Sequence, residues 1–146
     1  MNESFDIGER FPSVTFGTSG VRALVADLDT EAVFAYVYAF MHQMRVVHAV
    51  HDGTTVAVGM DLRPSSPSIG TAVCGVLQVL GYRAEFLGAL PTPALALRCL
   101  TGGMPGIMVT GSHIPFDRNG IKFYSPAGEI LKAEEQAIVS CSIPAR

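Results

Sequence analysis

A group of chemically active side chains lies between two apolar segments in the last third of the chain. Segments 107–109 and 121–124 are short and mostly apolar, which is typical of buried strands, and the second carries Lys122. A polar loop held between two buried strands is poor material for a core and well suited to a site. The polar residues of this stretch include Ser112, His113, Asp117, Arg118, Asn119 and Lys122.

Ser112 is the candidate nucleophile, and its neighbours decide which chemistry suits it. A Ser-His-Asp hydrolase is suggested by the nearby His113 and Asp117. However, Thr110 and Ile114 occupy the two glycine positions of the Gly-x-Ser-x-Gly elbow on which such hydrolases present their serine. A hydrolase triad also draws its base from a distant part of the fold. Hydrolysis therefore ranks behind phosphoryl transfer.

Phosphoryl transfer fits this stretch better. A serine accepts a phosphoryl group, Lys122 stabilises its charge, and Gly111 frees the backbone to approach the phosphate. A phosphoserine carries about −1.5 to −2 charges at pH 7, so a facing Lys122 or Arg22 contributes about 1.5–3 kcal/mol. Taken alone, Lys122 is equally well interpreted as a solvated lysine on an edge strand.

An earlier segment, Gly17 to Arg22, has the composition of an anion-binding turn. Two glycines bracket Thr18 and Ser19, and Arg22 follows. Such a turn presents backbone N–H groups and a guanidinium to an anion. Without further context, a hairpin turn with a surface arginine is the simpler interpretation.

The remaining pattern predicts an α/β domain with three layers, in which helices flank a mixed, mostly parallel sheet. Asp29 or Thr30 caps the first long helix, and Ser66-Pro67 and Thr92-Pro93 start the next two. Asp61 and Arg63 fall on a strand-to-helix loop, where an ion pair that braces the loop is slightly favoured over ligand contact. We expect helices over residues 30–51, 66–80, 92–101 and 132–140, and strands over 14–16, 55–60, 83–87, 107–109 and 121–124.

Composition bounds the class of protein. The 146 residues suit one domain, and the net charge of −3 with no cluster of basic residues argues against nucleic acid or a membrane surface as partner. Three unpatterned cysteines favour reduced thiols and the cytoplasm, and we expect no signal peptide or membrane span. His48 and His51 lack further ligands at metal-binding spacing. A hydrophobic fraction of 49% is high, which suggests apolar surface that faces a missing neighbour.

Four motifs, in order, resemble one family. Residues 110–124 (TGSHIPFDRNGIKFY) look like the phosphoserine loop of the α-D-phosphohexomutases, the phosphoglucomutase and phosphomannomutase superfamily. The segments 16–22 (FGTSGVR), 61–66 (DLRPSS) and 91–94 (PTPA) resemble other signatures of that family's first domain. The sequence departs from the usual pattern in two motifs: Ile114 stands where asparagine is common, and Ala23 where glycine is frequent. Gly111 also replaces a common alanine.

The resemblance implies a set of roles. Ser112 is the phosphoryl carrier, modified to phosphoserine and bound to Mg²⁺ through its phosphate. His113 lies beside it, Lys122 acts as acid/base and electrostatic group, and Arg22 contacts the transferring phosphate. The other expected phosphate or substrate contacts are Thr18, Ser19 and Asn119. A bisphosphorylated sugar is the implied activator, and the substrate is a hexose phosphate.

The resemblance covers the first of the family's four domains, assigned here to residues 1–146. The motifs for the metal cage, the sugar loop and the distal phosphate clamp are not present in this sequence. We therefore expect the catalytic-serine domain of a sugar-phosphate mutase, inactive alone, whose remaining domains come in cis or from a partner chain. The alternative is a stand-alone module that binds a phosphate, a sugar phosphate or a protein without turnover.

Overall fold

The strands of the main sheet lie in the order β2-β3-β7-β6-β4-β5, and β8 pairs with the C-terminal end of β7. The structure is a computed structural model, and it describes residues 3–111 and 114–145. A separate two-stranded sheet joins β1 to β9. The strands are β1 (Ser4–Asp6), β2 (Thr15–Phe16), β3 (Val21–Leu24), β4 (Thr55–Met60), β5 (Arg83–Ala89), β6 (Gly106–Val109), β7 (Arg118–Ser125), β8 (Gly128–Glu129) and β9 (Ser142–Pro144).

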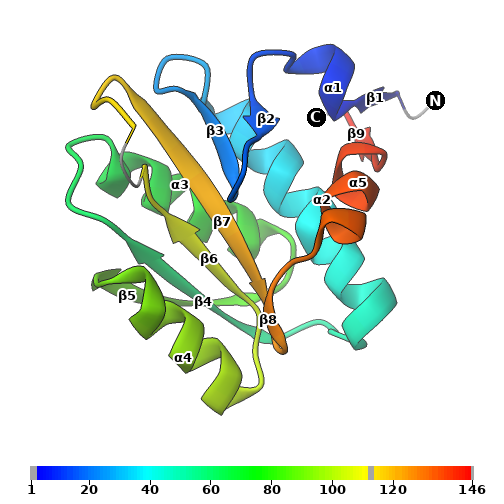
Figure 1. The fold of residues 1–146 in the computed structure, drawn as a ribbon. Helices are drawn as coiled ribbons and strands as arrows, with labels where there is room; N and C mark the ends of the chain where they lie inside the picture. Colours follow the sequence, from blue (N-terminus) through cyan, green and yellow to red (C-terminus); the bar gives the residue numbers. More distant parts are fainter. Residues whose placement is uncertain (1–2, 112–113, 146) are drawn as a thin grey trace.

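Helices cover both faces of the sheet, so the expected three-layer α/β architecture is confirmed (Figure 1). The helices α2 and α3 lie behind the sheet in this view, and α4 lies in front of its β4 end. No helix in the described part of the chain combines the length and apolar character needed to cross a membrane. The helices are α1 (Ile7–Arg10), α2 (Thr30–His48), α3 (Ser66–Val79), α4 (Thr92–Gly102) and α5 (Lys132–Val139).

Strand alternation divides the core in two. On one face, Val56, Val58, Ile107 and Phe123 join the larger apolar cluster, which includes the buried side of α2. Their sequence neighbours point to the other face, because successive side chains of a strand alternate. There they meet α4 in a smaller cluster formed by Ala57, Met108, Tyr124, Leu95 and Cys99.

Local sequence signals account for most helix ends. Asp29 caps α2, as expected, because its Oδ1 accepts a hydrogen bond of 2.9 Å from the Ala32 N–H. At the other end of α2, Ala49 adopts a left-handed conformation with φ 54°, so the helix ends three residues before the predicted residue 51. The N-cap position of α3 is Ser65 and not Ser66, and the Ser66 hydroxyl serves the site described below.

The sheet is less parallel than expected. Parallel pairing is confined to β4 with β5 and β4 with β6, whereas β6–β7, β3–β7, β2–β3 and β7–β8 are antiparallel. The physical reason is connection length: the links β2–β3, β6–β7 and β7–β8 are too short to contain the crossover that a parallel pair requires.

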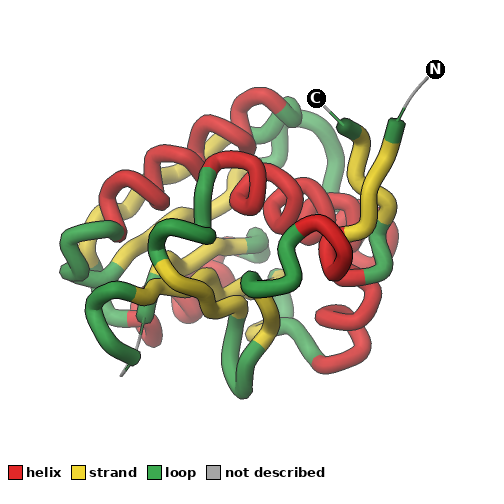
Figure 2. Tube along the Cα trace, turned by 90° about the horizontal axis from the view of Figure 1, so that it is seen from above, coloured by secondary structure: helices red, strands yellow, loops and turns green. Residues whose placement is uncertain are grey.

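A terminal unit was not predicted from the sequence. Phe5 of β1 pairs with Ile143 of β9, so segments from opposite ends of the chain lie side by side, as Figure 2 shows. The short helix α1 follows β1 directly, and Asp6 caps it. Ile7 and Ile143 are both fully buried in the larger cluster, which ties this unit to the rest of the domain.

Replacing Gly75 with alanine is expected to stabilise the domain by about 0.5–1 kcal/mol. Gly75 lies inside α3, and a Cβ built there meets no atom within 4 Å. The control is Gly120→Ala, because a Cβ at Gly120 would lie 2.3 Å from the Val21 carbonyl oxygen and push β3 away from β7. Urea unfolding of the three proteins checks this, and a Gly75→Ala variant less stable than wild type contradicts it.

Candidate active site

Asp61 and Arg63 form an ion pair at the carboxyl end of β4, as the favoured interpretation of the sequence predicted. The Arg63 Nε lies 3.3 Å from Asp61 Oδ2, and the Arg63 side chain is 6% exposed. The Asp61 Oδ1 accepts hydrogen bonds from the Arg63 N–H at 3.0 Å and from the Ser66 hydroxyl. The pair is thus fixed to the start of α3.

Arg63 reaches across to the loop between β6 and β7. Its Nη1 donates to the carbonyl oxygens of Pro115 at 2.8 Å and Arg118 at 3.3 Å, and its Nη2 donates to that of Ile114. The guanidinium also lies over the Phe116 ring, 5.1 Å from its centroid. One planar side chain therefore holds the far part of this loop at several points.

Asp61 holds the near part of the same loop. Its Oδ2 accepts a hydrogen bond of 2.9 Å from the Gly111 N–H, and the Gly111 carbonyl accepts one of 3.0 Å from the Ile114 N–H. Ser112 and His113 lie outside the described residues. The residues on either side of them, Gly111 and Ile114, are thus both anchored by the Asp61–Arg63 pair.

Gly111 has a packing role that was not predicted from the sequence. A Cβ at this position would lie 2.1 Å from the Arg63 Nε and 2.3 Å from its Cζ. The space that the missing side chain leaves is therefore filled by the guanidinium. In this chain, glycine at position 111 permits the close packing of Arg63 against the loop.

Asn119 is fully buried and is used within the domain. Its Nδ2 donates to the hydroxyl oxygens of Ser65 at 2.8 Å and Ser66 at 3.0 Å, and its Oδ1 accepts from the Gly120 N–H at 2.8 Å. The structure thus places this expected ligand contact between β7 and the start of α3, where it fixes the loop to the helix.

The pKa of the Asp61 carboxyl lies below its ordinary value. Burial opposes ionisation, but hydrogen bonds from the Ser66 hydroxyl, the Gly111 and Arg63 N–H groups and the Thr110 hydroxyl favour the carboxylate more strongly. A carboxyl with a depressed folded-state pKa contributes stability that is fully present above its unfolded pKa of about 3.9 and is lost as pH falls through the folded value.

We therefore expect Asp61→Asn to flatten the acid limb of the stability profile. As the pH falls below about 4, the wild-type free energy of unfolding should fall more steeply than that of the variant, which is the less stable protein at pH 7. Urea unfolding across this range measures the difference. Parallel profiles for the two proteins would show that Asp61 gains no proton on acid unfolding.

Arg22 and Lys122 lie on the same face of the sheet. Arg22 pairs with Gly120 in the β3–β7 register, and Lys122 is two residues further along β7. Because β7 lies between β3 and β6, the edge-strand interpretation of Lys122 is wrong. In Figure 1, α4 covers this face on the side of the sheet where β4 lies, and β2 and β3 lie on the opposite side. Neither cation forms a hydrogen bond or ion pair with any other described residue.

The turn between β2 and β3 packs directly against Lys122. The Gly17 N–H donates to the Gly20 carbonyl at 2.8 Å, which closes the predicted hairpin turn. Gly20 has φ 79°, and a Cβ there would lie 2.8 Å from the Lys122 Cγ. Thr18 is exposed at the tip of this turn. Glycine is required at position 20 both by its backbone conformation and by this contact.

Two residues near the end of the chain, Glu129 and Lys132, brace this turn, and no local pattern predicted them. The Ser19 hydroxyl donates to Glu129 Oε2 at 2.8 Å, so this expected phosphate contact has a partner inside the domain. The Lys132 Nζ donates to the Gly17 carbonyl at 3.4 Å. Both contacts join segments more than 100 residues apart, which local patterns do not reveal.

The start of the Ser112 loop and the two cations, Arg22 and Lys122, are carried by three neighbouring strands. The Thr110 N–H donates to the Gly120 carbonyl at 3.0 Å, and Gly120 is the register partner of Arg22. The chain therefore enters the Ser112 loop from β6, adjacent to the strand β7 that carries Lys122, and Arg22 lies one strand further on, in β3. An anchored loop next to two cations is suited to an anionic group.

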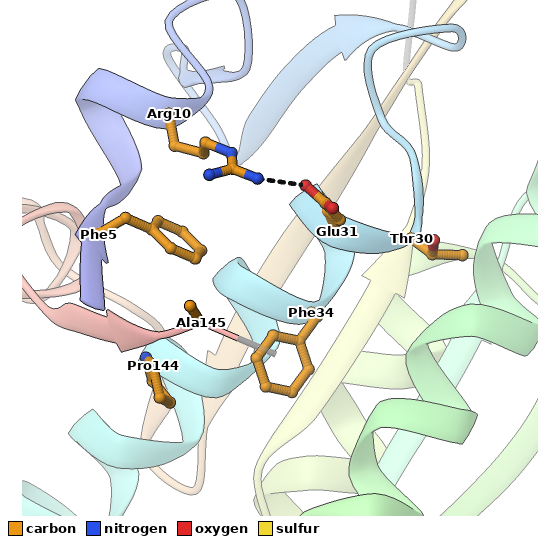
Figure 3. Close-up of a pocket in the computed structure, with 7 residues that line it drawn as sticks. All are labelled: Phe5, Arg10, Thr30, Glu31, Phe34, Pro144 and Ala145. Atoms are coloured by element: carbon orange, nitrogen blue, oxygen red, sulfur yellow. Dashed lines mark hydrogen bonds and ion pairs between the residues drawn. The ribbon is translucent and has the colours of Figure 1, made fainter. Parts of the chain in front are cut away.

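A hollow of about 150 Å³ lies at the terminal unit and not at this loop (Figure 3). Arg10 and Glu31, the two charged residues that line it, form an ion pair, in which Arg10 Nη2 lies 3.1 Å from Glu31 Oε2. The rest of its lining is mostly apolar, with Phe5, Phe34 and Pro144 prominent. It offers no convergent set of catalytic groups, so the loop beside Arg22 and Lys122 remains the candidate site.

Comparison with known proteins finds a family whose domain matches most of this chain. Residues 13–143 match the sequence profile of the family described as "Phosphoglucomutase/phosphomannomutase, alpha/beta/alpha domain I". The chain belongs to this family. A phosphomannomutase of Salmonella muenchen is 46% identical over 126 residues, and a phosphoglucosamine mutase of Glaesserella parasuis is 38% identical over 125 residues. The α/β/α architecture of the family's domain I is the one observed here.

The match covers most of this chain but a small part of each relative. It includes 86% of this chain and 26% of the Salmonella protein, and 84% and 28% for the Glaesserella protein. A phosphoglucomutase/phosphomannomutase family protein of Burkholderia thailandensis superposes with a TM-score of 0.68 at 28% identity, covering 82% of this chain and 28% of that one. Paramecium parafusin shares the fold, with a TM-score of 0.71 at 20% identity, covering 88% of this chain and 26% of that one.

Proposed function

We propose that this chain is the catalytic-serine domain of a hexose-phosphate mutase, with Ser112 as the phosphoryl carrier. The observation that carries the proposal is the anchoring of the Ser112 loop by Asp61 and Arg63 beside Arg22 and Lys122. The phosphohexomutase family membership supports it. In keeping with three free cysteines, we propose a cytoplasmic setting.

The proposed reaction moves one phosphoryl group at a time. The Oγ–P bond of phosphoserine 112 breaks as a hydroxyl oxygen of a hexose monophosphate bonds to the phosphorus, and the hydroxyl proton passes to a base. The bisphosphorylated sugar then turns around and returns its other phosphoryl group to Ser112. We assign the acid/base role to Lys122 and stabilisation of the transferring charge to Arg22, with His113 beside the serine.

Magnesium does not fit the described residues on their own. They include no group of three or more histidine, cysteine, aspartate or glutamate side chains able to hold a metal ion. In a complete mutase the phosphate on Ser112 would supply one ligand, and other parts of the protein would supply the rest.

Phosphate labelling tests the proposal. In the test protein, this chain replaces the segment of the Salmonella phosphomannomutase to which it aligns, and the remaining 74% of that enzyme is kept. We name this protein the fused mutase. Incubation with a ³²P-labelled bisphosphorylated hexose should label Ser112, and Ser112→Ala should abolish both labelling and turnover. The matched control is Ser68→Ala, because Ser68 is an exposed serine in α3. A Ser112→Ala protein that still carries label overturns the assignment.

The second candidate is a module that binds a phosphate, a sugar phosphate or a protein without turnover. Its supporting observation is the short match, because the chain spans about a quarter of the length of the curated relatives. A chain that binds sugar phosphate but never carries phosphate on Ser112, alone or in the fused mutase, would favour this candidate.

A further inference from the structure

Lys122 lies at a junction between two strands that pair with the same edge of β7. On the edge opposite β6, the pairing with β3 ends at Ile121, and the pairing with β8 begins at Tyr124. Lys122 therefore falls between the two ladders on this edge. The β2–β3 turn packs into this position, since a Cβ at Gly20 would lie 2.8 Å from the Lys122 Cγ.

The same turn also contacts the second cation. A Cβ at Gly17 would lie 3.4 Å from the Arg22 Cδ and 3.6 Å from its Nε, so the arginine side chain runs alongside the start of the turn. The end of the turn meets Lys122 through Gly20. Because one turn packs against both side chains, a shift of the turn changes the surroundings of both cations.

A hydrogen bond bridges the junction at Lys122. Tyr124 and Glu129 lie opposite each other in the β7–β8 pair, and Lys122 is two residues from Tyr124, so the three side chains share one face. Burial raises the pKa of Tyr124 to about 12, and the nearby Glu129 carboxylate contributes to the same shift. The Glu129 Oε2 accepts a hydrogen bond of 2.8 Å from the Ser19 hydroxyl. This hydrogen bond ties the turn to β8.

Lys132 makes a weaker contact with the same turn. Its Nζ lies 3.4 Å from the Gly17 carbonyl oxygen, and its side chain is 70% exposed and also pairs with Glu135. The hydrogen bond from Ser19 to Glu129 is shorter, and Ser19 is half-buried. The Ser19–Glu129 hydrogen bond is therefore the stronger of these two restraints on the turn.

We propose that Ser19 and Glu129 are positioning residues for phosphoryl transfer, which hold the β2–β3 turn against Lys122 and so fix the place of its ammonium group. This inference rests on the proposed function of Lys122. Ser19 then serves the reaction through the turn and not by binding the phosphate. Such a restraint matters because a misplacement of about 1 Å at a reacting centre costs about 10²-fold in rate.

Acylation of the lysines in this chain tests whether the turn holds Lys122. The sequence contains two lysines, Lys122 and Lys132, so mass spectrometry reads the reaction of each with trace acetic anhydride separately. Ser19→Ala and Glu129→Ala should each raise the acylation rate of Lys122 several-fold, because a loosened turn no longer covers its stem. Lys132 is the internal reference, since it is already exposed. Ser13→Ala is the matched control, because Ser13 is an exposed serine just before β2.

Kinetics of the fused mutase test whether this restraint serves catalysis. Ser19→Ala and Glu129→Ala should each lower kcat about tenfold and leave KM within about twofold of the unaltered protein. Glu129→Gln should restore most of kcat, because its carboxamide oxygen accepts the same hydrogen bond. The double variant Ser19→Ala/Glu129→Ala should be no slower than either single variant, because each change removes the same hydrogen bond.

The other outcomes overturn the inference. Unchanged acylation of Lys122 in both alanine variants does so, as does a Glu129→Gln protein as slow as Glu129→Ala. A loss of kcat in Ser19→Ala alone would mean that Ser19 contacts the phosphate directly. If urea unfolding shows that Glu129→Ala does not fold, Ser19→Ala decides by the same criteria, since it removes one hydroxyl and leaves every charge in place.

Positioning and function fail separately in this design, because acylation does not require turnover. A fused mutase that never labels Ser112 refutes the proposed function, and the acylation of Lys122 still shows whether Ser19 and Glu129 hold it. A fused mutase that labels Ser112 and keeps its full kcat in Ser19→Ala refutes the positioning role alone.

Discussion

Replacing Lys122 with alanine in the fused mutase is expected to lower kcat by roughly 10²–10³-fold, the effect of removing one charge-stabilising group from a transition state. The ammonium group makes no hydrogen bond or ion pair with the other described residues, so its removal leaves no buried partner among them unsatisfied. We therefore expect the free energy of unfolding to change by less than about 0.5 kcal/mol. Steady-state kinetics and urea unfolding measure the two quantities on the same preparation.

Lys132→Ala is the matched control for Lys122→Ala. Lys132 also reaches the β2–β3 turn, through the Gly17 carbonyl, but its side chain is 70% exposed and pairs with Glu135. Its loss should leave kcat nearly unchanged. If Lys122→Ala loses stability in step with activity, or if both variants lose the same activity, Lys122 is a structural residue and the assignment fails.

Replacing Arg63 with leucine should destabilise the domain by about 3–5 kcal/mol, the usual cost of breaking a buried ion pair from one side. The change leaves the Asp61 carboxylate without its cation and removes the donors to the carbonyls of Ile114, Pro115 and Arg118. Gly111 would also lose the group packed against it. Urea unfolding of the isolated chain measures the loss.

The control for Arg63 is Arg98→Leu. Arg98 also forms a bidentate ion pair, with Glu85 as its partner. This pair lies on the exposed side of α4 and β5, where solvent screens it. Arg63→Lys separates charge from shape, because lysine keeps the charge but not the planar fork that spans several carbonyls. The account of Arg63 is wrong if Arg63→Leu is no less stable than Arg98→Leu.

Local sequence signals predicted the parts of the fold that lie within one element. Thr55–Met60 was predicted to the residue, the Asp29 cap is present, and α4 begins at Thr92 as expected, although its N-cap position is Pro91 and not Thr92. The Asp61–Arg63 ion pair was also foreseen, because strand-to-helix loops gather polar groups at the end of a sheet.

Contacts between distant segments were not predictable. The reach of Arg63 to the β6–β7 loop, the Ser19–Glu129 hydrogen bond and the pairing of β1 with β9 each depend on where the sheet places elements far apart in the sequence. Gly111 illustrates the difference. The sequence alone shows that position 111 has no side chain. Only the folded chain shows that the guanidinium of Arg63 fills the space that a side chain would occupy.

The pairing of β1 with β9 has a consequence for synthesis on the ribosome. Synthesis proceeds from the N-terminus, so β1 is made long before its partner strand β9. Phe5 cannot pair until Ile143 has been synthesised. Until then, Ile7 has only part of the cluster that buries it completely in the finished domain. Long-range pairing of this kind is slow, and an unpaired strand exposes an edge to other chains. A nascent chain that stalls short of β9 therefore leaves an adhesive N-terminal strand, which gives chaperones a defined segment to shield.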